Sequence, residues 1–181
     1  MTTALQHRPQ HAAVAVAAPA SEPTQFLTFM LAGEIYAIGI LVVKEIIEYR
    51  GLTEVPMMPP SVRGVINLRG AVVPVVDLQA RFGRRPSEVT KRTCIVIVEV
   101  EAAAERHVVG VVVDAVNEVL EIPGSEIEPA PAFGARIRSD FIAGMGKVKG
   151  RFVILLDPAH VLSLEEIGSV AQAAPDVVTA P

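Results

Sequence analysis

The fold is decided by two stretches of sequence, Gly64–Asp77 (GVINLRGAVVPVVD) and Gly144–Asp157 (GMGKVKGRFVILLD), which lie 80 residues apart. In both, the first and seventh residues are glycine, the last is aspartate, and a basic residue, Arg69 or Lys149, precedes the seventh. These matches fall where a backbone must turn or a strand must end. We therefore interpret the stretches as two copies of one strand–turn–strand unit, with chance alignment of valine-rich strands as the alternative.

A second match, at a shift of 73 residues, lays Tyr36–Pro56 on Val109–Pro129. The duplication divides the chain into halves of about 60 residues, each the size of one small β-barrel. Because so short a half holds little core, we expect the two barrels to pack on each other and bury a shared seam.

Apolar runs of strand length recur along the chain, with turn residues between them. The clearest runs are Phe26–Leu31, Ile35–Val43, Val72–Val76, Cys94–Val100, Val108–Val113 and Phe152–Leu156. Short helices are expected at Leu78–Phe82 and Ala159–Ile167, the second with Asp157 as its N-cap. The pattern predicts a mostly β fold with short helices at the connections and near the C-terminus.

The two ends of the chain differ from its middle. Residues 1–23 and 169–181 are rich in Ala, Val and Pro, and we expect a disordered N-terminal tail and a flexible C-terminal tail there. Residues 24–168 are predicted to form one domain, with subdomains at roughly 24–90 and 91–168.

Composition argues against several classes of function. Of 181 residues, 16 are Lys or Arg and 20 are Asp or Glu, and only 4% are aromatic, which disfavours a nucleic-acid surface. No apolar run approaches the ~18 residues of a membrane span. The single cysteine, Cys94, begins an apolar run and is expected to be a buried thiol, which leaves no internal disulfide and no multi-thiolate metal site.

No residues form a recognisable catalytic, cofactor or metal site. Gly144–Gly150 looks like a glycine-rich phosphate loop, but a strand pattern follows it where such a loop needs a helix, so a hairpin turn is expected. Asp77, Asp114 and Asp157 each close an apolar run and are interpreted as strand-end or helix-capping residues. The sequence predicts a protein that is not an enzyme.

Two charged residues are candidates for binding. Arg69 is predicted in a turn beside Ile66 and Leu68, as either a solvated turn cation or part of an exposed amphipathic patch. Glu45 lies in the apolar stretch Val42–Ile47, either on the solvated face of a strand or on a charged rim beside an apolar groove. The residues alone leave both alternatives open.

Seven segments between Gln25 and Leu164 match motifs of one known family, and the match keeps one register along the chain. They are Gln25–Leu31, Glu34–Ile40, Val43–Ile46, Pro59–Leu78, Gly110–Leu120, Ile127–Pro131 and Gly144–Leu156. Read together, they resemble the CheW family of bacterial chemotaxis adaptors. The resemblance implies two SH3-like five-stranded β-barrel subdomains packed together, which is consistent with the duplication.

The resemblance also implies a function without catalysis. Members of this family couple the tips of methyl-accepting chemoreceptors to the regulatory domain of the histidine kinase CheA. They act in the cytoplasm, in arrays at the inner face of the membrane, with no cofactor, no nucleic acid and no insertion into the membrane. By motif, Val43, Glu45 and Arg69 correspond to receptor-side residues, with Ile40 and Ile46 as apolar neighbours. No motif identifies the residues that face the kinase.

Two other functions stay open on sequence alone. The same domain serves chemosensory pathways with other outputs, such as pilus motility. A nucleic-acid-binding β-barrel is less favoured because of the acidic net charge. The chain also departs from the family, because it reads Tyr-Ala-Ile-Gly-Ile at Tyr36–Ile40 where the family often has Tyr-Gly-Ile-Asp-Ile. The resemblance implies that the receptor tip lies in the groove between the two subdomains, and this change alters one polar contact beside that groove.

Overall fold

Four two-residue turns set the pairing of most strands. The computed structural model describes residues 22–131 and 137–163. Both residues of each turn have positive φ, at Ala32–Gly33, Arg69–Gly70, Ala103–Ala104 and Lys149–Gly150. Two successive positive φ angles are typical of a type I′ turn, whose twist matches that of antiparallel strands. The predicted hairpin in each duplicated stretch is therefore confirmed.

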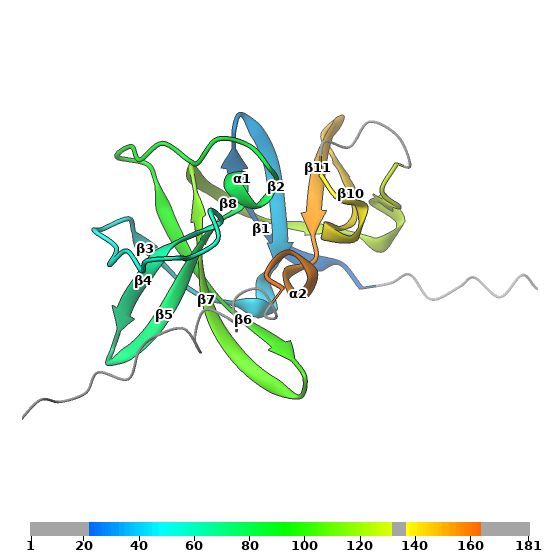
Figure 1. The fold of residues 1–181 in the computed structure, drawn as a ribbon. Helices are drawn as coiled ribbons and strands as arrows, with labels where there is room; N and C mark the ends of the chain where they lie inside the picture. The colour runs from blue at the N-terminus through cyan, green and yellow to red at the C-terminus, as the bar shows by residue number, and fades with distance from the viewer. Residues whose placement is uncertain (1–21, 132–136, 164–181) are drawn as a thin grey trace, which may run out of the picture.

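The strands form two sheets, which Figure 1 shows side by side. Sheet A has the order β8-β1-β2-β11-β10-β9, and sheet B has the order β3-β6-β7-β5-β4. The strands of sheet A are β1 (Thr24–Leu31), β2 (Glu34–Gly39), β8 (Ala115–Ile122), β9 (Ile127–Glu128), β10 (Ile142–Val148) and β11 (Arg151–Leu156). Those of sheet B are β3 (Val43–Glu48), β4 (Val62–Leu68), β5 (Ala71–Asp77), β6 (Cys94–Ala102) and β7 (Glu105–Val113).

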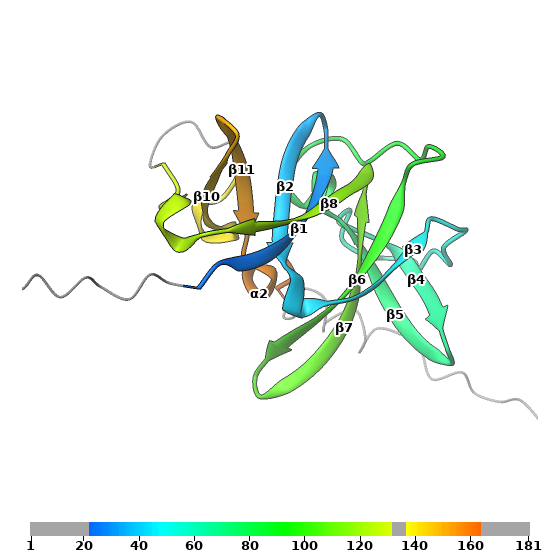
Figure 2. The ribbon, with the colours of Figure 1, turned by 180° about the vertical axis from the view of Figure 1, so that it is seen from behind.

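Each sheet takes strands from both halves of the chain. The β1–β2 hairpin of the first half pairs with β8 and β11, and the β6–β7 hairpin of the second half pairs with β3 and β5. In Figure 2 the chain runs from β2 into β3 and so passes from one sheet to the other. The strand pairing therefore does not follow the expected subdomains at 24–90 and 91–168, because a cut near residue 90 would divide both sheets.

Two one-turn helices follow the duplicated hairpins, α1 (Leu78–Arg81) and α2 (Pro158–Val161). Each begins at an aspartate, Asp77 or Asp157, whose carboxylate accepts hydrogen bonds from the backbone N–H groups two and three residues further on. The predicted N-cap at Asp157 is confirmed, and the predicted end of that helix lies outside the described residues. Single turns of 3-10 helix complete the fold at η1 (Ile40–Val42), η2 (Gly124–Glu126) and η3 (Ser139–Phe141).

The two sheets share one apolar core, and each also has a smaller core of its own. Along β6, Ile95 and Ile97 enter the core of sheet B, while Val96 and Val98 enter the shared core. Both faces of β6 are therefore buried, which explains why it reads as an unbroken apolar run without alternation. Cys94, at the start of this strand, is half-buried and packs against the shared core instead of being enclosed by it.

The predicted tails at 1–23 and 169–181 lie outside the described residues, apart from residues 22 and 23. Their disorder, and the limits 24–168 of the domain, stay predictions.

Candidate functional site

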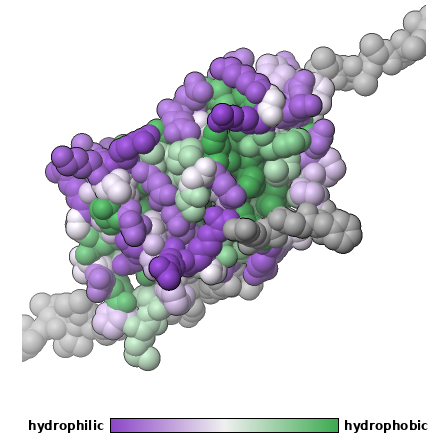
Figure 3. Space-filling model, turned by 90° about the horizontal axis from the view of Figure 1, so that it is seen from above, coloured by the Kyte–Doolittle hydropathy of each residue, from purple (hydrophilic) through white to green (hydrophobic). Residues whose placement is uncertain are grey.

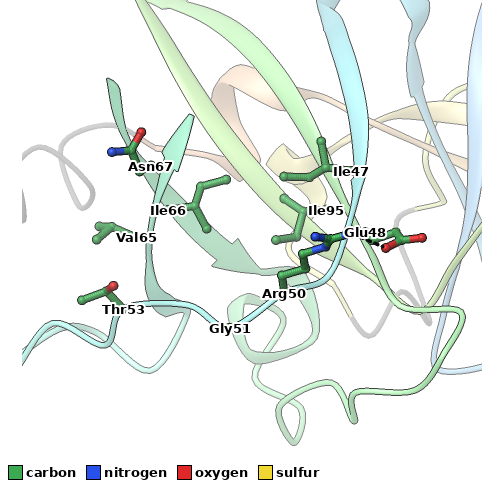
Figure 4. Close-up of a pocket in the computed structure, with 9 residues that line it drawn as sticks. All are labelled: Ile47, Glu48, Arg50, Gly51, Thr53, Val65, Ile66, Asn67 and Ile95. Carbon is green, nitrogen blue, oxygen red and sulfur yellow. Dashed lines mark hydrogen bonds and ion pairs between the residues drawn. The ribbon is translucent and has the colours of Figure 1, made fainter. Parts of the chain in front are cut away.

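Sheet B is open between its two edge strands, β3 and β4. The opening is a groove of about 670 Å³. Its lining consists of Ile47, Glu48, Arg50, Gly51, Thr53, Val65, Ile66, Asn67 and Ile95. In Figure 4 the side chains of Ile47, Ile66 and Ile95 point into the space between the strands. The groove thus has an apolar floor, with polar side chains around it.

One ion pair links the two sides of this opening. Glu45 lies on β3, and Arg69 lies in the turn between β4 and β5. Arg69 Nη1 donates to Glu45 Oε1 at 2.6 Å and Nη2 donates to Oε2 at 3.0 Å, which is the strong bidentate geometry of guanidinium and carboxylate. The hydrogen bonds from Arg69 hold the pKa of the Glu45 carboxyl below its ordinary value, and those to Glu45 raise the pKa of Arg69. The structure therefore joins the two charged residues that the sequence indicates separately.

A β-bulge in β3 divides the expected receptor residues between two faces of the strand. The register with β6 shifts between Val43 and Glu45. Val43 pairs with Val98, which belongs to the shared core, whereas Glu45 pairs with Ile97, which belongs to the core of sheet B. Because a bulge inserts one extra residue, it changes the face on which the following side chains lie. Glu45 consequently lies beside the groove, and Val43 lies beside the shared core.

The other expected receptor residues occupy the margin of the shared core. Ile40, in η1, is half-buried and packs against that core, as Val43 does. Ile46 is 43% exposed on β3, and Leu41, which follows Ile40 in η1, is 95% exposed. The structure thus separates the Glu45–Arg69 pair from three apolar residues around η1, and it adds Leu41, which the sequence motifs do not indicate.

A second groove, of about 490 Å³, lies between η1, the β6–β7 hairpin and α2. Its lining consists of Val42, Glu99, Val100, Glu101, Arg106, Asp157, Pro158 and Ala159. On its rim Lys44 Nζ lies 2.8 Å from a carboxylate oxygen of Glu99, and the hydrogen bond from Lys44 lowers the pKa of Glu99. Figure 3 shows the molecule from above, where polar side chains surround a hollowed apolar area.

The position in sheet A that corresponds to the first groove is filled. Gly146 of β10 is the counterpart of Ile66 in the duplication. A Cβ atom on Gly146 would lie 2.9 Å from Cδ1 of Ile122, whose side chain is 1% exposed. Because residue 146 is a glycine, Ile122 packs directly against β10 and fills the space beside it.

The ion pair also has no equivalent in sheet A. Glu118 and Lys149 occupy the positions that correspond to Glu45 and Arg69. Both lie in the described part of the chain, and no ion pair joins them there. The duplicated framework therefore carries a bidentate pair and an open groove in sheet B alone, among the residues described.

The strand-end aspartates act as structural residues. Asp77 is fully buried, and besides capping α1 it accepts hydrogen bonds from Arg63 Nη1 at 3.1 Å, from the Ser87 N–H at 2.8 Å and from the Ser87 hydroxyl at 3.0 Å. Its counterpart Asp157 lies nearer the surface, where its Oδ2 is 2.9 Å from His160 Nδ1. Asp77 thus ties together Arg63 of β4, the start of α1 and Ser87, in agreement with the interpretation as a capping residue.

Metal-ligand clusters and membrane-spanning helices are both lacking in residues 22–131 and 137–163. No three His, Cys, Asp or Glu side chains of these ranges are grouped so that they could hold a metal ion. Nor does any helix in them have the length and apolar character needed to cross a membrane.

Known proteins identify the family of this chain. The family model described as the CheW-like domain matches residues 25–166. The chain belongs to the CheW family. The chemotaxis protein CheW of Bacillus subtilis is 37% identical over 84% of this chain and 93% of its own length, and that of Klebsiella aerogenes is 36% identical over 81% and 86%. The crystal structure of the scaffolding protein TtCheW from Thermoanaerobacter tengcongensis superposes with a TM-score of 0.67 at 35% identity, covering 75% of this chain and 89% of that one.

These similarities confirm the resemblance drawn from the motifs and the fold it implies. The chain is a chemotaxis adaptor of the CheW family, a family of scaffolds and adaptors. The alternatives of another output pathway and of a nucleic-acid-binding barrel are not favoured.

Proposed function

We propose that this CheW-family protein joins chemoreceptor tips to the regulatory domain of the kinase CheA, and that it does so without catalysis, in cytoplasmic arrays at the inner face of the membrane. Membership of an adaptor family supports the proposal. The observation that carries it is the Glu45–Arg69 pair beside an apolar groove. An apolar centre with a polar and charged rim is the usual anatomy of a protein–protein interface.

Within this surface, Arg69 is proposed to contact the receptor directly. Its side chain is 76% exposed although two of its donors are occupied by Glu45. A guanidinium has five N–H donors, so three remain for carboxylate or carbonyl groups of a partner. Glu45, which is 27% exposed, acts as a positioning residue, because it fixes the plane of the guanidinium before the partner arrives.

The apolar receptor residues are proposed to have two roles. Ile46 is exposed and supplies apolar contact area. Ile40 and Val43 are half-buried against the shared core, so they hold η1 and the start of β3 in place. The kinase-facing residues stay unassigned.

Assembly from purified components tests the adaptor function. The chain, a receptor-tip fragment and the CheA regulatory domain are mixed in pairs and all together, and the complexes are separated by sedimentation velocity. We expect each pair with the chain to associate, and all three components to sediment as one species. If the receptor fragment and the kinase domain displaced each other from the chain, the coupling function would be excluded.

A further inference from the structure

The edge of β4 is unpaired at the place where sheet B is open. Thr53 and Val65 exchange both backbone hydrogen bonds, at 3.0 and 2.9 Å, as an isolated bridge. The backbone polar groups of Val65 thus point away from β5, toward the opening. Along a strand, the backbone N–H and C=O groups of every second residue point to the same side, so those of Asn67 also point toward the opening. In the described part of the chain no backbone group pairs with Asn67 on that side.

An unpaired edge beside an apolar floor favours the addition of a further strand. Extended segments add to such edges through main-chain hydrogen bonds, and their alternate side chains enter the adjacent pocket. Here the side chains of Ile47, Ile66 and Ile95 would be covered. In sheet A, by contrast, β9 already pairs with β10 at Gly146, the counterpart of Ile66.

We propose that residues Pro175–Pro181 of this chain (PDVVTAP) add to β4 at Asn67 and cover the groove, so that a receptor reaches its apolar floor only by displacing them. The described chain ends at Ser163, which lines one small cavity together with Ser61 and Val62, at the beginning of β4. From Val62 to Asn67 the strand advances about 17 Å, whereas the eleven residues 164–174 reach up to about 36 Å when extended. The described chain therefore ends close to the strand with which the segment is proposed to pair, and the intervening residues are long enough to reach it.

The composition of the segment fits this position. Asp176-Val177-Val178-Thr179 is mostly β-branched, which favours a strand, and a proline at each end of the segment limits the pairing to a few residues because proline has no N–H donor. One of the two valines must face the groove, since side chains alternate.

Amide hydrogen exchange, followed by NMR on the full chain and on a chain that ends at Ala174, tests this proposal. We expect the Asn67 amide to exchange about tenfold or more faster in the shorter chain. The amide of Lys147, the counterpart of Asn67 on β10, serves as the internal control and is expected to be unchanged. Equal exchange of Asn67 in both chains would overturn the proposal.

A pair of full-length variants separates strand addition from a mere effect of length. Val177→Asp with Val178→Asp is expected to expose the Asn67 amide as the truncation does, because a carboxylate cannot enter the apolar groove. Ala171→Asp with Ala173→Asp adds the same charge outside the segment and is expected to keep the protection. Protection that rises with protein concentration would assign the groove to a second copy of the chain and contradict the proposal.

Discussion

In sheet A, Gly146 allows Ile122 to pack over β10, and the space beside that strand is closed. In sheet B the same position holds Ile66, and a groove of about 670 Å³ lies beside it. Both sheets keep the type I′ turn and the aspartate N-cap of the duplicated unit. The duplication thus preserves the residues that determine backbone geometry, while the side chains between them differ and provide a binding surface in one copy.

The largest expected difference between the copies concerns the two capping aspartates. Asp77→Ala leaves the largely buried Arg63 without its carboxylate and removes the partner of Ser87, so it should lower the free energy of unfolding by about 3–5 kcal/mol. Asp157→Ala removes only a helix cap and an exposed contact, and should cost about 1 kcal/mol. Urea unfolding of both variants measures the difference. Equal losses would show that the buried network does not distinguish the copies.

A smaller difference is expected at the glycines that open the two stretches. Gly64 has a φ of +151°, and a Cβ there would collide with the backbone oxygen of Thr53, so Gly64→Ala should cost about 3 kcal/mol. Gly144 has no such φ, and its Cβ would lie 2.8 Å from a methyl carbon of Ile127 and 3.1 Å from the backbone oxygen of Glu128, which is a milder clash than that of Gly64. Gly144→Ala should therefore cost about 1 kcal/mol. Thermal unfolding of the two variants measures both losses of stability. A larger loss for Gly144→Ala would contradict the expected collision between the Cβ of residue 64 and Thr53.

The smallest effect on stability is expected from the ion pair of sheet B. Because Arg69 lowers the pKa of folded Glu45, the stabilisation is present above the ordinary glutamate pKa of about 4.3 and is lost as the pH falls through the lower folded value. For so exposed a pair this stabilisation is small, because solvent screens the two charges. The difference in free energy of unfolding between the wild type and Glu45→Gln should be constant above about pH 5 and shrink below it. Glu118→Gln is the control, and a difference that grows toward acid would reverse the expected sign.

The sequence was sufficient for the features that depend on neighbouring residues. Arg69–Gly70 and Lys149–Gly150 indicate turns because glycine accepts positive φ, and an aspartate followed by Pro158 indicates a helix start. The turn at Ala103–Ala104 has no glycine and therefore gives no such signal. Family motifs then supplied the architecture.

Features that depend on distant residues could not be predicted in this way. The sequence does not show that the β1–β2 and β6–β7 hairpins each join the sheet of the other half of the chain, because the two hairpins have similar apolar patterns. Glu45 and Arg69 are 24 residues apart, and they meet only because β3 and β4 become the edges of one curved sheet. The bulge that turns Glu45 toward the groove leaves no mark in the alternation of an apolar strand.

The affinity of a receptor-tip fragment for matched variants of the two sheets shows whether sheet B alone provides the receptor-binding surface. Calorimetric titration compares the wild type, Glu45→Ala with Arg69→Ala in sheet B, and Glu118→Ala with Lys149→Ala in sheet A, each with its free energy of unfolding. We expect about a tenfold or greater loss of affinity for the sheet B pair alone, because removing an interface arginine commonly costs more than 1 kcal/mol. Unchanged affinity of the sheet B pair, or an equal loss for the sheet A pair, would contradict it.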